Sequence, residues 1–155
     1  MSTGALELSR WSLHDLLLET SGPEFDQVLD GLEQAVSELE DARGTLSPEI
    51  SEEKFGELLA LLERISELTN RLGAYAHLWY AEDTQRQDTL TFRGRIQKLL
   101  AEIRNRTLFF TLWWKGLEEG PAQRLLAVSG DDRYYLESLR RFKPYTLTEA
   151  EEKVI

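Results

Sequence analysis

The two histidines, His14 and His77, are the first candidates for metal or acid–base chemistry, because the 155-residue chain contains no cysteine. No second histidine follows His77 within a helical turn, so the zinc-peptidase pattern of two histidines with a glutamate between them is absent. Neither histidine has an acidic residue three positions before it, which excludes the Glu-x-x-His ligand pair of di-iron bundles. The sequence therefore predicts no metal ligands and no cofactor-binding residues in this chain.

Serines and carboxylates also lack the arrangements that catalysis requires. No serine lies in a Gly-x-Ser-x-Gly sequence, which would indicate a hydrolase nucleophile. Acidic residues are frequent at 38–41, 49–53 and 131–132, but none of these groups has the spacing of a calcium loop. The pairs at 52–53 and 131–132 are expected in first helical turns, where they complement the helix dipole. We predict no catalytic residue.

Composition and charge narrow the class of protein. With 41% hydrophobic and 30% charged residues, the chain fits one globular domain. Its net charge of −10 opposes binding to nucleic acid or to anionic membranes, so neither partner is expected. The lack of cysteine, of a signal peptide and of a spanning segment favours a cytoplasmic location.

The two halves of the chain differ in charge. Residues 1–85 carry 5 basic and 18 acidic side chains, and residues 86–155 carry 13 basic and 10 acidic side chains. Pairing between these halves is favoured over an acidic surface for a cationic partner.

Three long segments repeat apolar residues at alternating spacings of three and four, which is typical of one face of a helix. The repeats run over Phe25–Leu46, Phe55–Trp79 and Phe92–Leu117. A short link near Asp83 predicts that the second and third helices, each about 45 Å long, fold back on each other. The predicted fold is all-α: an antiparallel hairpin of long helices, a third long helix packed on it, and short C-terminal helices.

Capping signals predict where the helices begin. Ser21 and Glu24 form a capping-box pattern before the first helix, and Ser51 is the expected N-cap of the second. Thr148 and Glu151 form another capping box. The helix that they begin, over 146–155, is expected to lead into a further domain that is absent from this chain.

Two shorter helices are expected before that point. Gly120 and Pro121 begin the first of them, which reaches about Val128, and the second covers about 132–142. These helices matter because they could cover an unusual segment of the third long helix.

This unusual segment, 108–117, has seven large apolar residues among its ten positions, on every side of the helix. A helix that is apolar all round must be buried all round. Either the short C-terminal helices cover its outer side, or part of it docks on another subunit, a further domain or a ligand. The candidate domain-interface or oligomer surface consists of Phe109, Leu112, Trp113 and Trp114.

Four segments, taken in order, resemble the N-terminal region of the oligoendopeptidase F family of thimet-oligopeptidase-like zinc metallopeptidases. They are Trp11–Leu16, Tyr75–Asp83, Phe109–Trp114 and Tyr135–Lys153. The last is the most informative, with its Tyr-Leu-Glu at 135–137, Arg140, Pro144 and the run Leu-Thr-Glu-Ala-Glu-Glu-Lys at 147–153. The likeness covers nearly the whole chain.

The resemblance implies an almost entirely helical enzyme that binds one zinc through a His-Glu-x-x-His helix and hydrolyses short peptides in a cleft between two lobes. The zinc helix of that family lies downstream of the region resembled here, so no catalytic residue is carried over. Residues 1–155 would be a single non-catalytic domain, with an N-terminal extension over 1–20. It would form a wall of the cleft, and its partners would be the absent C-terminal catalytic domain and short peptides. The alternative is a stand-alone helical interaction module, a homo-oligomer with no enzymatic role.

Overall fold

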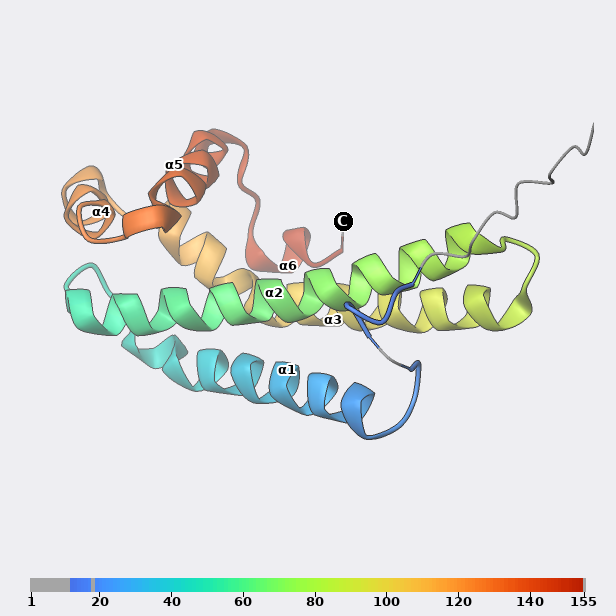
Figure 1. The fold of residues 1–155 in the computed structure, drawn as a ribbon. Coiled ribbons are helices and arrows are strands. Elements are labelled where there is room, and N and C mark those ends of the chain that lie inside the picture. Colours follow the sequence, from blue (N-terminus) through green and yellow to red (C-terminus); the bar gives the residue numbers. More distant parts are fainter. Residues whose placement is uncertain (1–11, 18, 155) are drawn as a thin grey trace, which may run out of the picture.

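The computed structural model describes residues 12–17 and 19–154. The expected all-α class is confirmed, and no strand occurs within these ranges (Figure 1). Trp11, most of the predicted N-terminal extension and Ile155 lie outside the described residues. The helices are α1 (Pro23–Asp41), α2 (Glu52–Glu82), α3 (Gln87–Gly116), α4 (Glu119–Leu126), α5 (Arg133–Arg141) and α6 (Glu149–Glu152), with short 3-10 turns at Ala42–Thr45, Gly130–Asp132 and Lys143–Tyr145.

The hairpin of α2 and α3 is the centre of the fold. The two helices run antiparallel, and residues 83–86 join them (Figure 1). Their facing stripes are buried, with Leu72 at 0% and Ile96 at 1% exposure. A side-chain carbon added at Gly73 would lie 3.3 Å from Leu100 Cδ1, so the glycine allows the two helices to approach closely.

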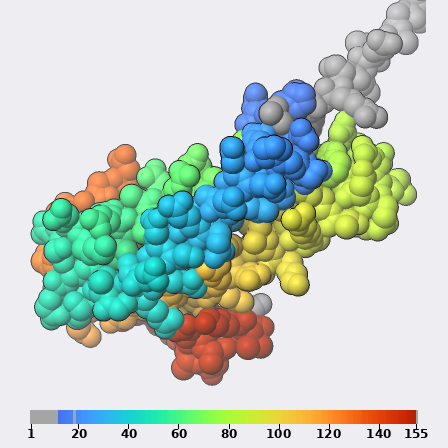
Figure 2. All heavy atoms as spheres, turned by 90° about the horizontal axis from the view of Figure 1, so that it is seen from below, coloured from blue at the N-terminus to red at the C-terminus, as the bar shows by residue number. Residues whose placement is uncertain are grey.

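The remaining helices cover the hairpin from different sides. Figure 2 shows α1, in blue to cyan, lying along the hairpin, and Phe25, Leu32 and Leu39 of α1 are buried in the common core. Figure 1 shows α4 and α5 at the end of the hairpin where α2 begins and α3 ends. The predicted arrangement of a third long helix on the hairpin, followed by short C-terminal helices, is confirmed.

Two of the three predicted caps are present. The Ser51 hydroxyl accepts a hydrogen bond from the Lys54 amide at 3.1 Å, and Thr148 with Glu151 forms a reciprocal capping box at the start of α6. The acidic pair at 52–53 lies in the first turn of α2 as expected, whereas the pair at 131–132 lies in the 3-10 turn before α5.

The capping box predicted at Ser21 and Glu24 is wrong. The N-cap of α1 is Gly22, and no side chain caps the helix. Gly22 has φ 102°, a conformation that a residue with a side chain rarely adopts. Pro23 then occupies the first helical position, where its missing N–H leaves no donor to satisfy. Backbone geometry therefore begins this helix in place of a side-chain hydrogen bond.

The predicted attraction between the two halves of the chain is realised at Arg106 of α3. Its guanidinium donates to Glu33 Oε2 at 2.7 Å and to Glu40 Oε2 at 2.6 Å, both on α1. Within the first half of the chain, Arg71 of α2 also pairs with Glu24 of α1 at 2.9 Å. These bonds clamp the acidic α1 onto the hairpin.

Arg106 should make stability depend on pH. Its hydrogen bonds hold the pKa of Glu33 and of Glu40 below the ordinary value for glutamate. A carboxyl with a lowered pKa stabilises the fold above its unfolded pKa, and this contribution is lost as the pH falls through its folded pKa. Because both carboxylates are partly exposed, we expect Arg106→Met to cost only about 1 kcal/mol at pH 7.

The measurement is urea unfolding of the wild type and of Arg106→Met at pH 7 and at pH 3. The difference in unfolding free energy should shrink at the lower pH, because the pH then lies below the ordinary pKa of glutamate and the contribution of the lowered pKa values is being lost. Arg104→Met is the matched control, since Arg104 lies on the same helix and forms no ion pair with a described residue. An equal difference at both pH values would show that Arg106 acts through packing alone.

Candidate docking surfaces

The histidines that opened the sequence analysis lie apart in the structure. His14 is exposed in a turn before α1, and His77 is exposed on α2. Among residues 12–17 and 19–154, no three His, Cys, Asp or Glu side chains are grouped so that they could hold a metal ion. The candidate sites that remain in the part of the chain that the structure describes are its surfaces and grooves.

Trp114 of the predicted interface set is part of the chain's own core. Its side chain is fully buried, and its ring lies 5.7 Å from that of Phe55 at the start of α2. The indole Nε1 donates a hydrogen bond of 2.8 Å to the backbone oxygen of Leu136 on α5. Arg140 of α5 lies 5.8 Å above the same ring. Trp114 thus attaches α5 to the hairpin and is not available to another molecule.

Phe109 is also covered from within the chain. Only 5% of the residue is exposed, and the guanidinium of Arg43 lies 4.9 Å above its ring. Arg43 in turn pairs with Glu149 of α6 at 2.8 Å. Phe109 therefore takes part in the contact that holds α6 near α3.

Leu112 and Trp113 are the half-buried members of the set. The Trp113 ring packs against Phe55 and Phe110, at 6.3 and 5.6 Å. Its Nε1 is buried and finds no hydrogen-bond partner among the described residues. The interface role predicted for the four residues therefore stays a prediction that rests on Leu112 and Trp113, while Phe109 and Trp114 are buried by the chain's own elements.

The exposed apolar surface lies elsewhere, in the C-terminal segment, which the sequence analysis selected for its resemblance and as the start of a further domain but did not include among the four candidate interface residues. Among the described residues, most of the large hydrophobic side chains that are exposed belong to the segment from 134 to 154. Spacing did not reveal them, because α5 is short and the segment after it is irregular. Their concentration of tyrosine and phenylalanine was the available signal. They are Tyr134, Tyr135, Phe142, Tyr145, Leu147 and Val154.

These residues fall into two groups along the chain, each of which we name as a face. The first, which we call the α5 face, comprises Tyr134, Tyr135, Ser138, Arg141 and Phe142, with Tyr135 at its edge beside the hairpin. The second, the tail face, comprises the exposed apolar residues that follow: Tyr145, Leu147 and Val154.

The inward side of α5 is firmly anchored. Leu136 is fully buried. Arg140 donates hydrogen bonds to the backbone oxygens of Trp114 and Leu117 at 3.1 and 3.0 Å, which satisfies two carbonyls at the end of α3. The orientation of the α5 face is therefore fixed by the opposite side of the helix.

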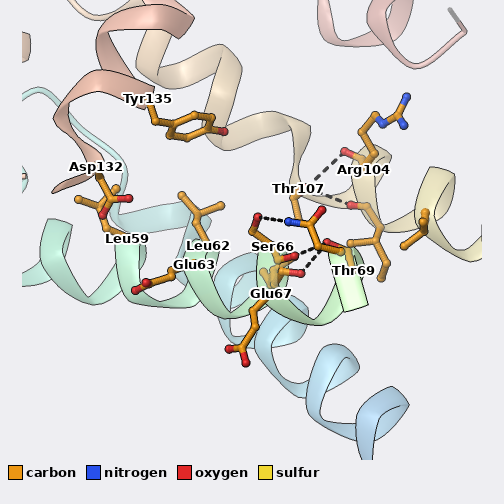
Figure 3. Close-up of a pocket in the computed structure, with 14 residues that line it drawn as sticks. Leu59, Leu62, Glu63, Ser66, Glu67, Thr69, Arg104, Thr107, Asp132 and Tyr135 are labelled. Atoms are coloured by element: carbon orange, nitrogen blue, oxygen red, sulfur yellow. Dashed lines mark hydrogen bonds between the residues drawn. The ribbon is translucent and has the colours of Figure 1, made fainter. Parts of the chain in front are cut away.

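A groove of about 520 Å³ runs between the hairpin and α5 (Figure 3). Leu59, Leu62 and Ile103 are among its apolar residues. Figure 3 shows Tyr135 extending over the groove from α5, with Asp132 beside it. Partial burial of the phenol, reinforced by the charge of Asp132, raises the pKa of Tyr135.

The polar groups that line the groove are of two kinds: hydrogen-bonded threonine hydroxyls and solvent-exposed carboxylates. The hydroxyls of Thr69 and Thr107 donate to carbonyls of their own helices, at 2.7 and 3.0 Å. The carboxylates of Glu63 and Glu67 are exposed along the same groove. This combination of apolar residues and carboxylates suits a partner side chain with an apolar stem and a cationic end.

Comparison of the chain with protein-family models, with curated proteins and with solved structures gives no match. Within the described ranges, no helix combines the length and the apolar character needed to cross a membrane.

Proposed function

We propose that this chain is a non-catalytic helical domain of a cytoplasmic zinc-dependent oligoendopeptidase, in which it forms one wall of the cleft that admits short peptides. The zinc and the catalytic residues would belong to a second domain that packs against it. One observation carries the proposal: the tail face is apolar and bare, with Tyr145 79%, Leu147 45% and Val154 86% exposed.

The tail face is bare although the segment is held in place. The capping box at Thr148 begins α6, and the pair between Glu149 and Arg43 fastens that helix to the main body. Full burial of a valine or leucine side chain contributes about 1.5–3 kcal/mol, so a positioned but uncovered set of such residues favours contact with another surface. The resemblance implies that the catalytic domain follows this segment, which is where the tail face lies.

A stand-alone helical interaction module is the second candidate. The α5 face favours it, because that helix presents aromatic side chains outward and has its own inward anchors. In this alternative the chain works by pairing, and no peptidase domain is required.

The isolated chain should neither bind zinc in a 1:1 complex nor cleave peptides. A catalytic zinc needs three protein ligands, and the two histidines lie on separate elements. Calorimetric titration with zinc and a quenched fluorescent peptide assay provide the measurements. A submicromolar 1:1 complex, or cleavage by the pure chain that a chelator stops, would contradict the proposal that this domain is non-catalytic.

The experiment that tests the proposed function uses the complete reading frame from which the chain derives. We expect it to encode a His-Glu-x-x-His helix downstream, and its product to cleave short peptides in preference to long ones. A tail-face variant, Leu147→Glu, should loosen the wall and let longer peptides be cleaved. Gln97→Glu, at an exposed position of α3 away from both faces, serves as the control for an added carboxylate. A reading frame without the zinc sequence would support the stand-alone module.

A further inference from the structure

We infer that the α5 face is a self-complementary surface through which two copies of this chain pair, with α5 of one copy antiparallel to α5 of the other. The inference rests on the order of residues along the α5 face, which has acidic residues at one end, aromatic residues in the middle and a basic residue at the other end. The inference goes beyond the peptidase-domain proposal, because it uses a surface separate from the tail face.

The aromatic middle is exposed and fixed in orientation. Tyr134 is 71%, Tyr135 49% and Phe142 61% exposed, although such side chains normally contribute strongly to cores and interfaces. Ser138 lies between them, and its hydroxyl donates to the Tyr135 backbone oxygen at 2.7 Å. A short side chain at the centre of the face lets a second helix approach at the usual distance of about 8–10 Å.

The charges at the two ends have opposite signs. Asp131 and Asp132 precede α5, and Arg141 is its last residue. None of the three forms an ion pair with a residue that the structure describes, whereas Arg133 and Glu137 on the flank of the helix pair with each other at 2.9 Å. The end charges also complement the dipole of their own helix. The three end charges can therefore form ion pairs with a partner molecule, whereas Arg133 and Glu137 already pair with each other.

Antiparallel pairing about Ser138 matches every part of the face. Residues equally distant from Ser138 then oppose each other, so Tyr134 meets Phe142 of the second copy and Tyr135 meets its Arg141. The first contact is an aromatic pair and the second a cation–π contact. Asp131 comes near the basic end of the second copy. In a two-fold dimer each of these contacts occurs twice.

The signs of the charges identify the occupant as a second copy. A purely acidic partner would satisfy Arg141 and repel Asp131, and a purely basic partner would do the reverse. Parallel pairing of two copies would place like charges together. A partner with one acidic and one basic end complements both, and an antiparallel second copy of this chain supplies these two ends. Because nine residues of α5 span only about 13 Å, the contact is small and the dimer should be weak and reversible.

Sedimentation analysis of the 155-residue chain, at concentrations from about 10 to 500 µM, tests the inference. We expect a concentration-dependent dimer. Arg141→Glu and Asp131→Arg should each weaken the association by about tenfold or more, because each places like charges together at both ends. An equimolar mixture of the two variants should restore it, since the added Glu at 141 then lies at the same end of the contact as the added Arg at 131, and the native charges remain together at the other end.

Two controls separate this contact from general charge effects. Lys98→Glu makes the same charge change as Arg141→Glu at an exposed position of α3 and should leave dimerisation unchanged. Leu147→Glu on the tail face should also leave it unchanged. Far-UV circular dichroism of each variant verifies that helical content is retained.

Three results would overturn the inference. They are a chain that stays monomeric over the whole concentration range, an Arg141→Glu variant that dimerises as tightly as the wild type, and a mixture of the two charge variants that associates no better than either alone. If Leu147→Glu alone abolished the dimer, association would belong to the tail face. That last outcome would overturn the α5 pairing without contradicting the tail face as a docking surface.

Discussion

Replacing Trp114 with alanine is expected to lower the free energy of unfolding by about 3–5 kcal/mol, the range for large aromatic residues in cores. The side chain is fully buried, and its removal leaves a cavity beside Phe55. It also leaves the backbone oxygen of Leu136 without the indole donor that lies 2.8 Å away. Loss of this buried hydrogen bond adds to the cost. Urea unfolding followed by circular dichroism measures the loss.

Trp114→Phe provides a graded control for this prediction. It keeps an aromatic ring against Phe55 but removes the donor to Leu136, so its cost should lie between zero and that of the alanine variant. The hydrogen bond joins α3 to α5, and amide exchange in α5 should therefore rise in both variants. A loss below about 1 kcal/mol for Trp114→Ala would mean that α5 is not attached through this residue.

The second large effect is expected for Leu72→Ala in the middle of α2. Leu72 is fully buried in the hairpin core, so truncation should destabilise the chain by about 2–5 kcal/mol. The adjacent Gly73 already lets α3 come close, which limits how far the helices can move to fill the cavity. Denaturant unfolding with an unchanged slope against denaturant concentration would attribute the loss to the folded state.

Leu62→Ala is the matched comparison, because Leu62 belongs to the same stripe but is only half-buried. Its truncation should cost clearly less than that of Leu72. A loss of less than about 0.5 kcal/mol for Leu72→Ala would contradict the assignment of this stripe to the core.

The hairpin could be predicted because its information is local and repeated. Over Phe55–Trp79 and Phe92–Leu117 the spacing of apolar residues specifies helices, and the short link between them leaves an antiparallel return as the simple solution. The caps at Ser51 and Thr148 were also recognisable, since each needs only a hydroxyl and a nearby backbone amide. At Ser21 the same pattern failed, because Gly22 and Pro23 begin the helix by backbone geometry.

The docking surfaces could not be predicted because they depend on contacts between distant parts of the chain. Nothing near Trp114 in the sequence shows that Leu136 will accept its hydrogen bond, or that Arg43 will lie above Phe109. The same contacts that bury those two rings leave the α5 face and the tail face outside. The composition of segment 108–117 therefore indicated that its apolar side chains must be buried, but not which part of the chain buries them.

The tail face is the feature on which the proposed function depends, and hydrogen–deuterium exchange tests it most directly. The chain should be measured alone and in the presence of the catalytic domain that the proposed function places after it. The account predicts slower exchange over residues 143–154 when that region is added, with little change in α1, and loss of the effect in Leu147→Glu. Unchanged exchange over 143–154 would contradict the claim that the tail face packs on a catalytic domain.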